Sequence, residues 1–420
     1  MPQSRGITSW IGAPLARGTQ QKNPGGWVTY ADESTAADCV NVRSGTFVSC
    51  TIDISPKTLS TMMGGQNCHA DITFADGEVW LARFRLSSAI SPPTEVRDYV
   101  LHSEAATMEF LSRHTNVPSP RVFDWACESD PTNTVGVAYI LMQKLDGKPL
   151  DWQGATGAQK EKVVQQLADI MLEIEAHPFD KLGSLMATKE SLENEARPRT
   201  SAVESQLQVQ GLAKHSTFRS GIDGRPPMPF SLFREAFRTL VKANLRMIAD
   251  GEIGTAENKV DLFLAHRFRL ETLDQVWKPS MTSEKFYLKH PDDKGDHILV
   301  DHDFDIIGII GWEWSSIVSK EEAFASPCMM WPVAAFYDGS NQLVDEELLL
   351  ARIFRQKCRE DLALCVLDGR RVQSLFFALG PGGASHSDKK TFARLFLGLK
   401  RAFESDRGFG EEEARTEDQD

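Results

Sequence analysis

The sequence predicts an α+β protein with a sheet-rich first lobe that carries one main helix, and a mainly helical second lobe. Two observations predict this class. Short apolar stretches rich in β-branched and aromatic residues fill the first third of the chain, and long stretches with helical apolar spacing dominate after Leu150. We therefore expect an N-terminal extension, a sheet-rich lobe, a helical lobe and an acidic tail, at residues 1–38, 39–146, 147–408 and 409–420.

The first lobe begins with a predicted β-hairpin. Residues 70–74 and 79–84 are rich in apolar and β-branched side chains, and Asp76-Gly77 lies between them as a turn sequence. Residues 46–52 alternate in the same way and predict another strand before the hairpin. These strands predict an antiparallel sheet.

One helix and two strands complete the first lobe. Apolar residues recur at helical spacing over 94–115, and the prolines Pro118 and Pro120 follow, so we expect a helix that ends before them. Residues 120–125 and 136–144 are apolar runs, the second rich in residues that favour strands. They predict two further strands.

The second lobe is predicted to be mainly helical. Apolar spacing predicts four long helices, at residues 158–177, 230–250, 346–367 and 389–405. Residues 197–229 are polar and contain much Gly, Ser and Pro, so we expect a long surface excursion there. The last residues, 410–420, are strongly acidic and predict a solvated, disordered tail.

The composition of the chain disfavours several classes of binding partner. The formal net charge is -13, which disfavours the phosphate backbone of nucleic acids. No apolar run is long enough for a membrane span or a signal peptide, so we expect no membrane partner and a cytoplasmic location. Seven scattered cysteines without a Cys-x-x-Cys pair predict reduced thiols rather than a zinc site or a disulfide framework. No protein partner follows from the sequence.

The most informative stretch is 286–314, which predicts loop, strand, turn and strand. It contains His290-Pro-Asp292, and it ends in Ile309-Ile-Gly-Trp-Glu313. This stretch resembles the catalytic segment of the aminoglycoside phosphotransferase family, particularly its fungal branch. That family has His-x-Asp, then Asn five residues after the Asp, then a hairpin that ends in Ile-Asp-Trp-Glu.

The resemblance continues upstream and covers roughly residues 63–327. Four more stretches look like the first lobe of that family: Trp80–Phe84, Glu104–Met108, Val117–Pro120, and Tyr139–Met142 before Gly147. The resemblance implies a bilobal protein kinase-like fold with the nucleotide bound on the side of the first lobe. It also implies a transferase that uses ATP and Mg²⁺ to phosphorylate a hydroxyl group of a small molecule.

The resemblance assigns the catalytic position to Asp292, which would orient the acceptor hydroxyl and take its proton. His290 would support that loop structurally. Phosphoryl transfer depends mainly on positioning and charge neutralisation, so a carboxylate near the acceptor and a cation near the phosphates are the expected residue types. The alternative for Asp292 is a loop carboxylate that caps a turn.

The nucleotide side would use Arg83, Glu104 and a glycine loop. Arg83 matches the phosphate-binding Lys of the family, and Glu104 on the following helix would hold it by a salt bridge. The alternative is an exposed ion pair worth at most about 1 kcal/mol. Gly64 and Gly65 precede Arg83 by one strand and could let backbone N–H groups approach phosphates, although two glycines are a weak signal.

Both metal positions of the family are altered. His297 stands in place of the metal-binding Asn, and Gly311 stands in place of the Asp of Ile-Asp-Trp-Glu. Mg²⁺ prefers oxygen ligands, so the usual two-metal site cannot form as such. Glu313 would share the strand face of Gly311 if the extended conformation continues, and could then bind metal with or without His297.

Three functions remain open. The first is an ATP-dependent phosphotransferase that acts on a small molecule. The second is a pseudokinase that binds nucleotide or a metabolite with an impaired metal site, because Gly311 removes a metal-anchoring carboxylate. The third is a pocket reused for acid–base chemistry by Asp292 without ATP.

Overall fold

The computed structural model describes residues 50–52, 62, 67–86, 91–133, 135–187, 207–213, 229–276, 285–375 and 389–404. They fall into two compact units. Unit 1 comprises residues 1–113, 119–145 and 186–208, and unit 2 comprises 114–118, 146–185 and 209–420. The expected N-terminal extension, the acidic tail, Gly64 and Gly65 lie outside the described residues.

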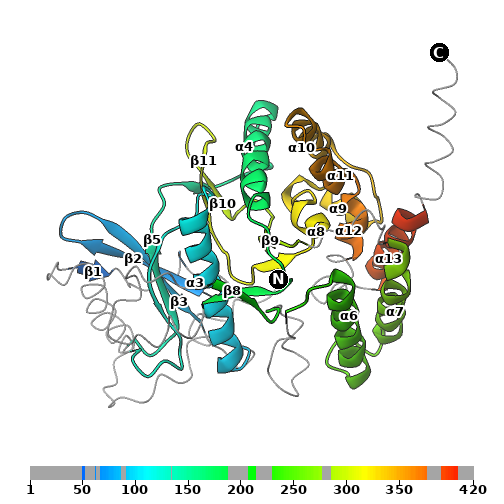
Figure 1. Ribbon diagram of the computed structural model, residues 1–420, viewed down its shortest axis with the longest axis horizontal. Helices are drawn as coiled ribbons and strands as arrows, with labels where there is room; N and C mark the ends of the chain where they lie inside the picture. Colours follow the sequence, from blue (N-terminus) through cyan, green and yellow to red (C-terminus); the bar gives the residue numbers. More distant parts are fainter. Residues whose placement is uncertain are drawn as a thin grey trace, which may run out of the picture. The chain divides into compact units, whose positions relative to one another are not determined.

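Unit 1 contains a five-stranded antiparallel sheet in the order β1-β2-β3-β5-β4 (Figure 1). Its strands are β1 Cys50–Ile52, β2 Asn67–Phe74, β3 Val79–Arg85, β4 Val122–Ala126 and β5 Tyr139–Gln143. The predicted hairpin is confirmed as β2 and β3. Gly77 makes its turn with a φ of 88°, a left-handed conformation that favours glycine.

The two faces of this sheet have different neighbours. Ile72, Trp80 and Leu141 belong to a buried apolar cluster in which the Trp80 and Phe123 rings stack. Side chains alternate along a strand, so Arg83 points to the opposite face from Trp80. That face meets α3 (Thr94–His114), the predicted main helix, because Glu104 of α3 pairs with Arg83.

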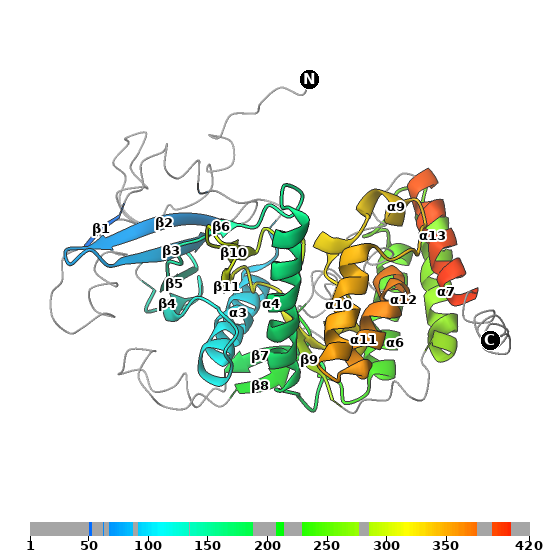
Figure 2. The ribbon, with the colours of Figure 1, turned by 90° about the horizontal axis from the view of Figure 1, so that it is seen from above.

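Unit 2 is mainly helical and carries short strands. Its helices of four or more turns are α4 Gly157–Glu175, α6 Phe233–Asp250, α7 Lys259–Val276 and α13 Lys389–Glu404. The shorter ones are α8 Lys320–Phe324, η3 Cys328–Met330, α9 Val333–Tyr337, α10 Asp345–Gln356, α11 Glu360–Leu367 and α12 Gly369–Gln373. Figure 2 shows α7 beside α13, where the rings of Phe268 and Phe396 meet at 5.3 Å.

The strands near the catalytic segment form two small antiparallel sheets. One has the order β11-β10-β6 and joins β6 Lys148–Pro149, β10 Ile298–Val300 and β11 Ile306–Ile309. The other pairs β9 Tyr287–Lys289 with β12 Ser316–Val318. The predicted strand, turn and strand of residues 286–314 are therefore confirmed as β10 and β11. A separate pair joins β7 Ser184–Ala187 and β8 Leu207–Gln210.

Two expectations for the second lobe are wrong. One continuous helix over 346–367 is replaced by α10 and α11, because Cys358 adopts a left-handed φ of 57° that ends the first helix. The polar region 197–229 is more than a surface excursion, since β8 lies within it and Leu212 and Ala213 are buried. Because the region as a whole is polar, its composition gave no indication of this short buried segment.

The helix α7 was missed for a physical reason. Val260 and Leu264 are exposed on it, so its apolar residues do not form a single buried stripe. No helix among the described residues combines the length and apolar character that crossing a membrane requires.

Candidate functional site

The candidate catalytic segment, residues 286–314, is held in place by its own hairpin turn and by α4. The Asp301 carboxylate accepts hydrogen bonds from the backbone N–H groups of Asp303 and Asp305, each at 2.9 Å. The Gln166 side chain of α4 accepts from the Ile306 N–H at 2.8 Å and donates to the Phe304 carbonyl at 2.9 Å. Both ends of the turn are thus fixed, and Asp301 is engaged in turn capping.

His290 connects the catalytic loop to the end of the hairpin. Its Nδ1 accepts a hydrogen bond from the Asp292 backbone N–H at 3.2 Å, so the ring proton lies on Nε2, which donates to the Ile310 carbonyl at 2.9 Å. Burial lowers the pKa of His290 to about 3, with the nearby His297 ring acting in the same direction. A neutral imidazole therefore fixes the backbone of Asp292.

The Asp292 carboxylate is accessible. Its side chain is 49% exposed and makes an ion pair with Lys294 at 3.1 Å. That contact raises the pKa of Lys294 above its usual value. The neighbouring Asp293 pairs with Lys289 at 3.3 Å, and its carbonyl accepts from the Met329 N–H at 3.0 Å. The loop thus presents a carboxylate to solvent on a fixed backbone, as a catalytic base requires.

His297 lies against the ring of His290. The two rings stack with centroids 4.2 Å apart, and the Trp312 ring meets His290 edge to face at 4.8 Å. Burial, followed by the charges of Lys289 and Lys294, lowers the pKa of His297 to about 4. Within the described part of the chain, Nδ1 of His297 is buried and has no hydrogen-bond partner.

Gly311 has a left-handed φ of 80°, and a Cβ added there would contact only His290 Nε2, at 3.9 Å. After it the chain turns. The Ser315 N–H donates to the Trp312 carbonyl at 3.1 Å, and Trp314 has a φ of 66°. The extended conformation that would place Glu313 on the strand face of Gly311 is therefore absent, and this basis for a metal-binding Glu313 is wrong.

The residues present do not fit the magnesium ions that the resemblance implies. Gly311 offers no side-chain oxygen, and His297 offers a nitrogen in a ring already stacked on His290. No group of three or more His, Cys, Asp or Glu side chains suited to a metal ion occurs among the residues that the structure describes.

Unit 1 carries the predicted pair Arg83 and Glu104. Arg83 Nη1 donates to Glu104 Oε1 at 2.7 Å, and Nη2 donates to Oε2, so the pair is bidentate. Both residues are buried, Arg83 at 6% and Glu104 at 2% exposure. The alternative of an exposed ion pair is wrong. Burial, with a contribution from the Arg83 charge, lowers the pKa of His69 on the neighbouring strand.

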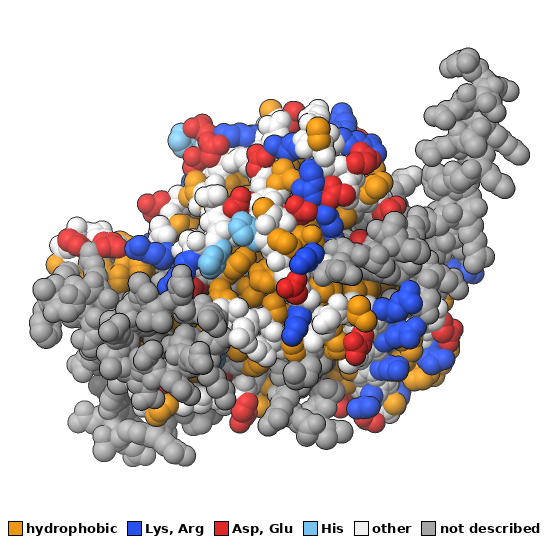
Figure 3. Space-filling model, in the orientation of Figure 1, with side chains coloured by type: hydrophobic (Ala, Val, Ile, Leu, Met, Phe, Trp, Pro, Cys, Tyr) orange, Lys and Arg blue, Asp and Glu red, His pale blue; other side chains and the backbone are white. Residues whose placement is uncertain are grey.

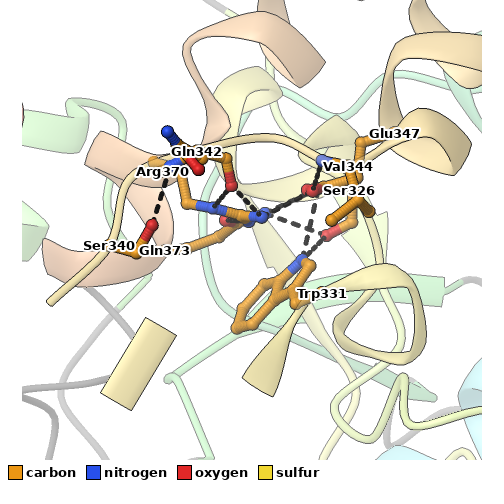
Figure 4. A network of polar contacts seen from close by, with 8 residues as sticks. All are labelled: Ser326, Trp331, Ser340, Gln342, Val344, Glu347, Arg370 and Gln373. Atoms are coloured by element: carbon orange, nitrogen blue, oxygen red, sulfur yellow. Dashed lines mark hydrogen bonds and ion pairs between the residues drawn. The ribbon is translucent and has the colours of Figure 1, made fainter. Parts of the chain in front are cut away.

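A buried polar network in unit 2 supports the loop that carries Asp292, and the sequence did not indicate it. The Ser326 hydroxyl donates to Glu347 at 2.6 Å, and Arg370 forms an ion pair with the same carboxylate (Figure 4). The Gln373 side chain donates to the Ser326 hydroxyl at 2.8 Å. The anchored segment continues to Met329, whose N–H holds the Asp293 carbonyl. No local pattern joins residues this far apart in the chain.

Lys289 and Lys294 were also missed as site residues. They alternate with aspartates over residues 289–296, a pattern that predicts solvated charges. In the folded loop Lys289 pairs with Asp293 and Lys294 pairs with Asp292, and the charges of both lysines help to lower the pKa of His297.

A second buried polar pair lies on α7. Arg269 Nη1 lies 2.9 Å from Nδ1 of His266, and its guanidinium lies over the Phe237 ring at 5.4 Å. Both residues are buried. Burial, with the Arg269 charge, lowers the pKa of His266 to about 3, so this imidazole is neutral and accepts the Arg269 hydrogen bond.

Comparison with solved structures identifies the fold. A protein of Ralstonia eutropha JMP134, described as a candidate aminoglycoside phosphotransferase, aligns with 89% of this chain and 98% of its own at a TM-score of 0.52 and 12% identity. A candidate fructosamine-3-kinase from Thermobifida fusca YX-ER1 aligns with 89% and 99% at a TM-score of 0.45 and 14% identity. The chain has the bilobal protein kinase-like fold of the aminoglycoside phosphotransferases, as the sequence resemblance implies.

Comparison with curated sequences adds fungal relatives. A subtelomeric hrmA-associated cluster protein of Aspergillus fumigatus strain Af293 is 31% identical over 140 residues, which cover 33% of this chain and 26% of that protein. Its counterpart in strain CEA10 is 30% identical over the same length. The match thus spans about a quarter of these relatives. No model of a known protein family matches the chain.

Proposed function

We propose that this protein is a phosphotransferase that moves the γ-phosphate of ATP to a hydroxyl group of a small molecule. The observation that carries the proposal is the geometry of the catalytic loop. His290 fixes the Asp292 backbone through Nδ1 and the hairpin through Nε2, while the Asp292 carboxylate is half-exposed. A fixed, accessible carboxylate suits proton removal from an acceptor hydroxyl.

In the proposed reaction, Asp292 accepts the proton of the acceptor hydroxyl. The acceptor oxygen forms a bond to the γ-phosphorus, and the bond from that phosphorus to the β–γ bridging oxygen breaks, which releases ADP. Arg83 contributes positive charge to the nucleotide phosphates, and the buried carboxylate of Glu104 orients its guanidinium.

The second candidate is a pseudokinase that binds nucleotide without turnover. Gly311 and the stacked His297 favour it, because they remove the oxygen ligands of the usual metal site. The third candidate, acid–base chemistry on a metabolite by Asp292, would need no nucleotide.

A nucleotide titration with matched variants separates the three. We expect ATP to raise the melting temperature of the native protein, since a ligand that binds only the folded state stabilises it. We also expect phosphate release from ATP that falls at least about 100-fold in Asp292→Asn. Asp303→Asn, in the exposed hairpin turn, is the control and should retain full turnover.

Two other results of this titration would favour the other two candidate functions. ATP binding without turnover in the native protein would favour the pseudokinase. The absence of any thermal response to nucleotides would favour the reused pocket and would contradict the proposed transfer.

Gly311→Asp tests the pseudokinase directly. The left-handed backbone there is one that Asp tolerates better than most residues, and the nearest atom to the new Cβ would be His290 Nε2 at 3.9 Å. If this variant hydrolyses ATP with Mg²⁺ while the native protein does not, the native chain is impaired at this position. Equal turnover by both proteins would reject the pseudokinase.

A further inference from the structure

The helix α6 presents a row of basic side chains to solvent (Figure 3). Four exposed residues at every fourth position make up this basic row: Arg234, Arg238, Lys242 and Arg246. Residues four apart are neighbours on a helix surface, so the row follows one side of α6. The acidic residues of the helix lie near its ends, at Glu235 in the first turn and Asp250 at the last position. The row therefore gives α6 a positively charged side.

Two cations of the basic row are available to a partner. Lys242 and Arg246 form no ion pair or hydrogen bond with the residues that the structure describes. On the neighbouring helix α7, by contrast, Arg267 pairs with Glu271 at 2.8 Å. An exposed cation can remain solvated, so the row alone does not define a contact. The complementary charge has to come from an identified partner.

We propose that the acidic segment 411–420 of this chain binds across the basic row of α6 and keeps other polyanions from that surface. The segment lies outside the described residues, and its sequence contains one arginine, Arg415, and six carboxylates: Glu411, Glu412, Glu413, Glu417, Asp418 and Asp420. Neither the row nor the segment belongs to the loop that carries Asp292. The inference is therefore independent of the proposed phosphotransferase activity.

The segment is attached close enough to reach the row. It follows α13, and α7 packs against both α6 and α13, with the Phe268 and Phe396 rings 5.3 Å apart. Two interhelical spacings place α6 and α13 roughly 20 Å apart. The chain from Glu404 to Glu411 can span roughly 23 Å when extended, and the chain to Asp420 roughly 50 Å. The row itself is roughly 18 Å long.

Attachment to α13 also makes a set of weak ion pairs sufficient. A single exposed ion pair contributes at most about 1 kcal/mol, so a separate acidic peptide would bind the row weakly. A short flexible connection instead gives the segment an effective concentration in the millimolar range. Salt screens exposed charges, so the contact should form at low ionic strength and be lost at high ionic strength.

The first experiment cross-links the full-length protein with a carbodiimide, which joins a lysine amine to a carboxylate in contact with it. Lys242 is the only lysine of α6, so its cross-links report on the basic row. We expect a cross-link from Lys242 to residues 411–420 at about 20 mM salt, and at least about fivefold less of it at about 500 mM. In an equal mixture of isotopically labelled and unlabelled protein, the cross-linked peptides should come from one chain.

The second experiment measures heparin binding at low salt by fluorescence anisotropy, with heparin as a polyanion probe. Changing the six carboxylates of 411–420 to amides should tighten heparin binding at least about tenfold. Adding Lys242→Gln and Arg246→Gln to that variant should remove the gain. The matched control adds Arg352→Gln and Lys357→Gln instead, which removes two exposed cations at the end of α10 and should retain the gain.

Several results would overturn the proposal. Cross-links that join only labelled to unlabelled chains would place the segment on a second copy of the protein. The absence of a Lys242 cross-link at low salt, or equal heparin affinity in the native protein and the amide variant, would exclude the contact. A gain in heparin binding that the α10 control also removes would be a general effect of net charge and would reject α6 as the docking surface.

Discussion

At the scale of single residues, burial decides what each predicted side chain can do. The sequence predicts that Arg83 and Glu104 form either an ion pair at the nucleotide site or an exposed ion pair. In the structure they form a buried, bidentate ion pair. A buried charge that loses its partner is strongly destabilising, whereas removal of both charges can be neutral. The pair can therefore be tested for stability and for function separately.

We predict that Glu104→Gln lowers the free energy of unfolding by about 3 kcal/mol, because it leaves Arg83 buried without a counter-charge. The double variant Arg83→Met, Glu104→Leu should regain most of that stability and should still lose nucleotide affinity. Urea unfolding followed by intrinsic tryptophan fluorescence, with ATP titration of the same samples, measures both effects.

The control for this pair lies in the same unit. Lys144 and Asp71 form an ion pair in which both side chains are about one-third exposed, so Asp71→Asn should change stability by less than about 1 kcal/mol. If the double variant binds ATP as tightly as the native protein, Arg83 has only a structural role.

We expect acid to destabilise the folded protein through its buried histidines. The contribution of His266 to this loss of stability can be measured by itself. Its pKa is about 3 in the folded state and 6.5 when unperturbed. Between these pH values the unfolded chain binds a proton that the folded chain does not, so stability is complete above pH 6.5 and falls as the pH is lowered. We expect a loss of about 2 kcal/mol from this residue between pH 7 and pH 5.

The measurement compares urea unfolding at the two pH values in the native protein and in His266→Gln. Glutamine keeps an acceptor for Arg269 and cannot titrate, so the variant should lose about 2 kcal/mol less on acidification. His302→Gln, at an exposed position, is the control for the effect of exchanging a histidine for glutamine. Identical pH slopes in His266→Gln and the native protein would contradict a buried neutral imidazole.

At the scale of elements, the loop that carries Asp292 depends on a segment that is distant in sequence. Residues 326–331 hold the Asp293 carbonyl through Met329, and the Met329 side chain packs near Gly295. Glu347 of α10 and Arg370 of α12 anchor this segment by way of Ser326 (Figure 4). The network thus links two helices to the geometry of the loop.

Two adjacent glutamates on α10 give a matched comparison. Glu347 has 0% exposure and neutralises Arg370, whereas Glu346 makes a partly exposed pair with Lys160. We predict that Glu347→Ala costs about 3 kcal/mol or more and that Glu346→Ala costs less than about 1 kcal/mol. Hydrogen exchange should also show faster exchange of the Met329 amide in Glu347→Ala. Equal costs in the two variants would reject the anchoring role of the network.

At the scale of the whole molecule, charge is distributed unevenly. Figure 3 shows Lys and Arg side chains gathered over α6, α7 and α13, while acidic side chains are interspersed elsewhere on that face. Four exposed basic residues recur every fourth position on α6: Arg234, Arg238, Lys242 and Arg246. The net charge of -13 nevertheless opposes long-range attraction to a polyanion.

We therefore predict no measurable binding to duplex DNA at 150 mM salt, with any affinity weaker than a Kd of about 10⁻⁴ M. Fluorescence anisotropy with a labelled duplex measures this directly. Binding that weakens steeply as salt is raised would instead identify α6 as a local nucleic-acid contact and would contradict the sequence-based expectation.

The sequence by itself determined the fold class, the hairpin β2–β3, the helix α3 and the hairpin β10–β11 that follows Asp292. These features depend on local signals, namely the Asp76-Gly77 turn, apolar spacing, and the order of residues around His290 and Asp292. Predictions from such local signals are correct when the turn or helix that the signal favours is also the one that packs in the folded protein. The division of residues 346–367 into two helices had no such signal, since nothing in the residue type of Cys358 demands a positive φ.

Only the tertiary structure decided the chemistry around Asp292. The chain turns after Gly311 and carries Glu313 off the expected strand face, while His297 stacks on His290. Lys289 and Lys294 pair with Asp293 and Asp292, and Glu347 and Arg370 support the loop from distant helices. Contacts between residues far apart in sequence depend on how elements pack, and a local pattern carries no information about that packing. The sequence therefore predicts Asp292 as the candidate base, and only the fold determines which charges surround it.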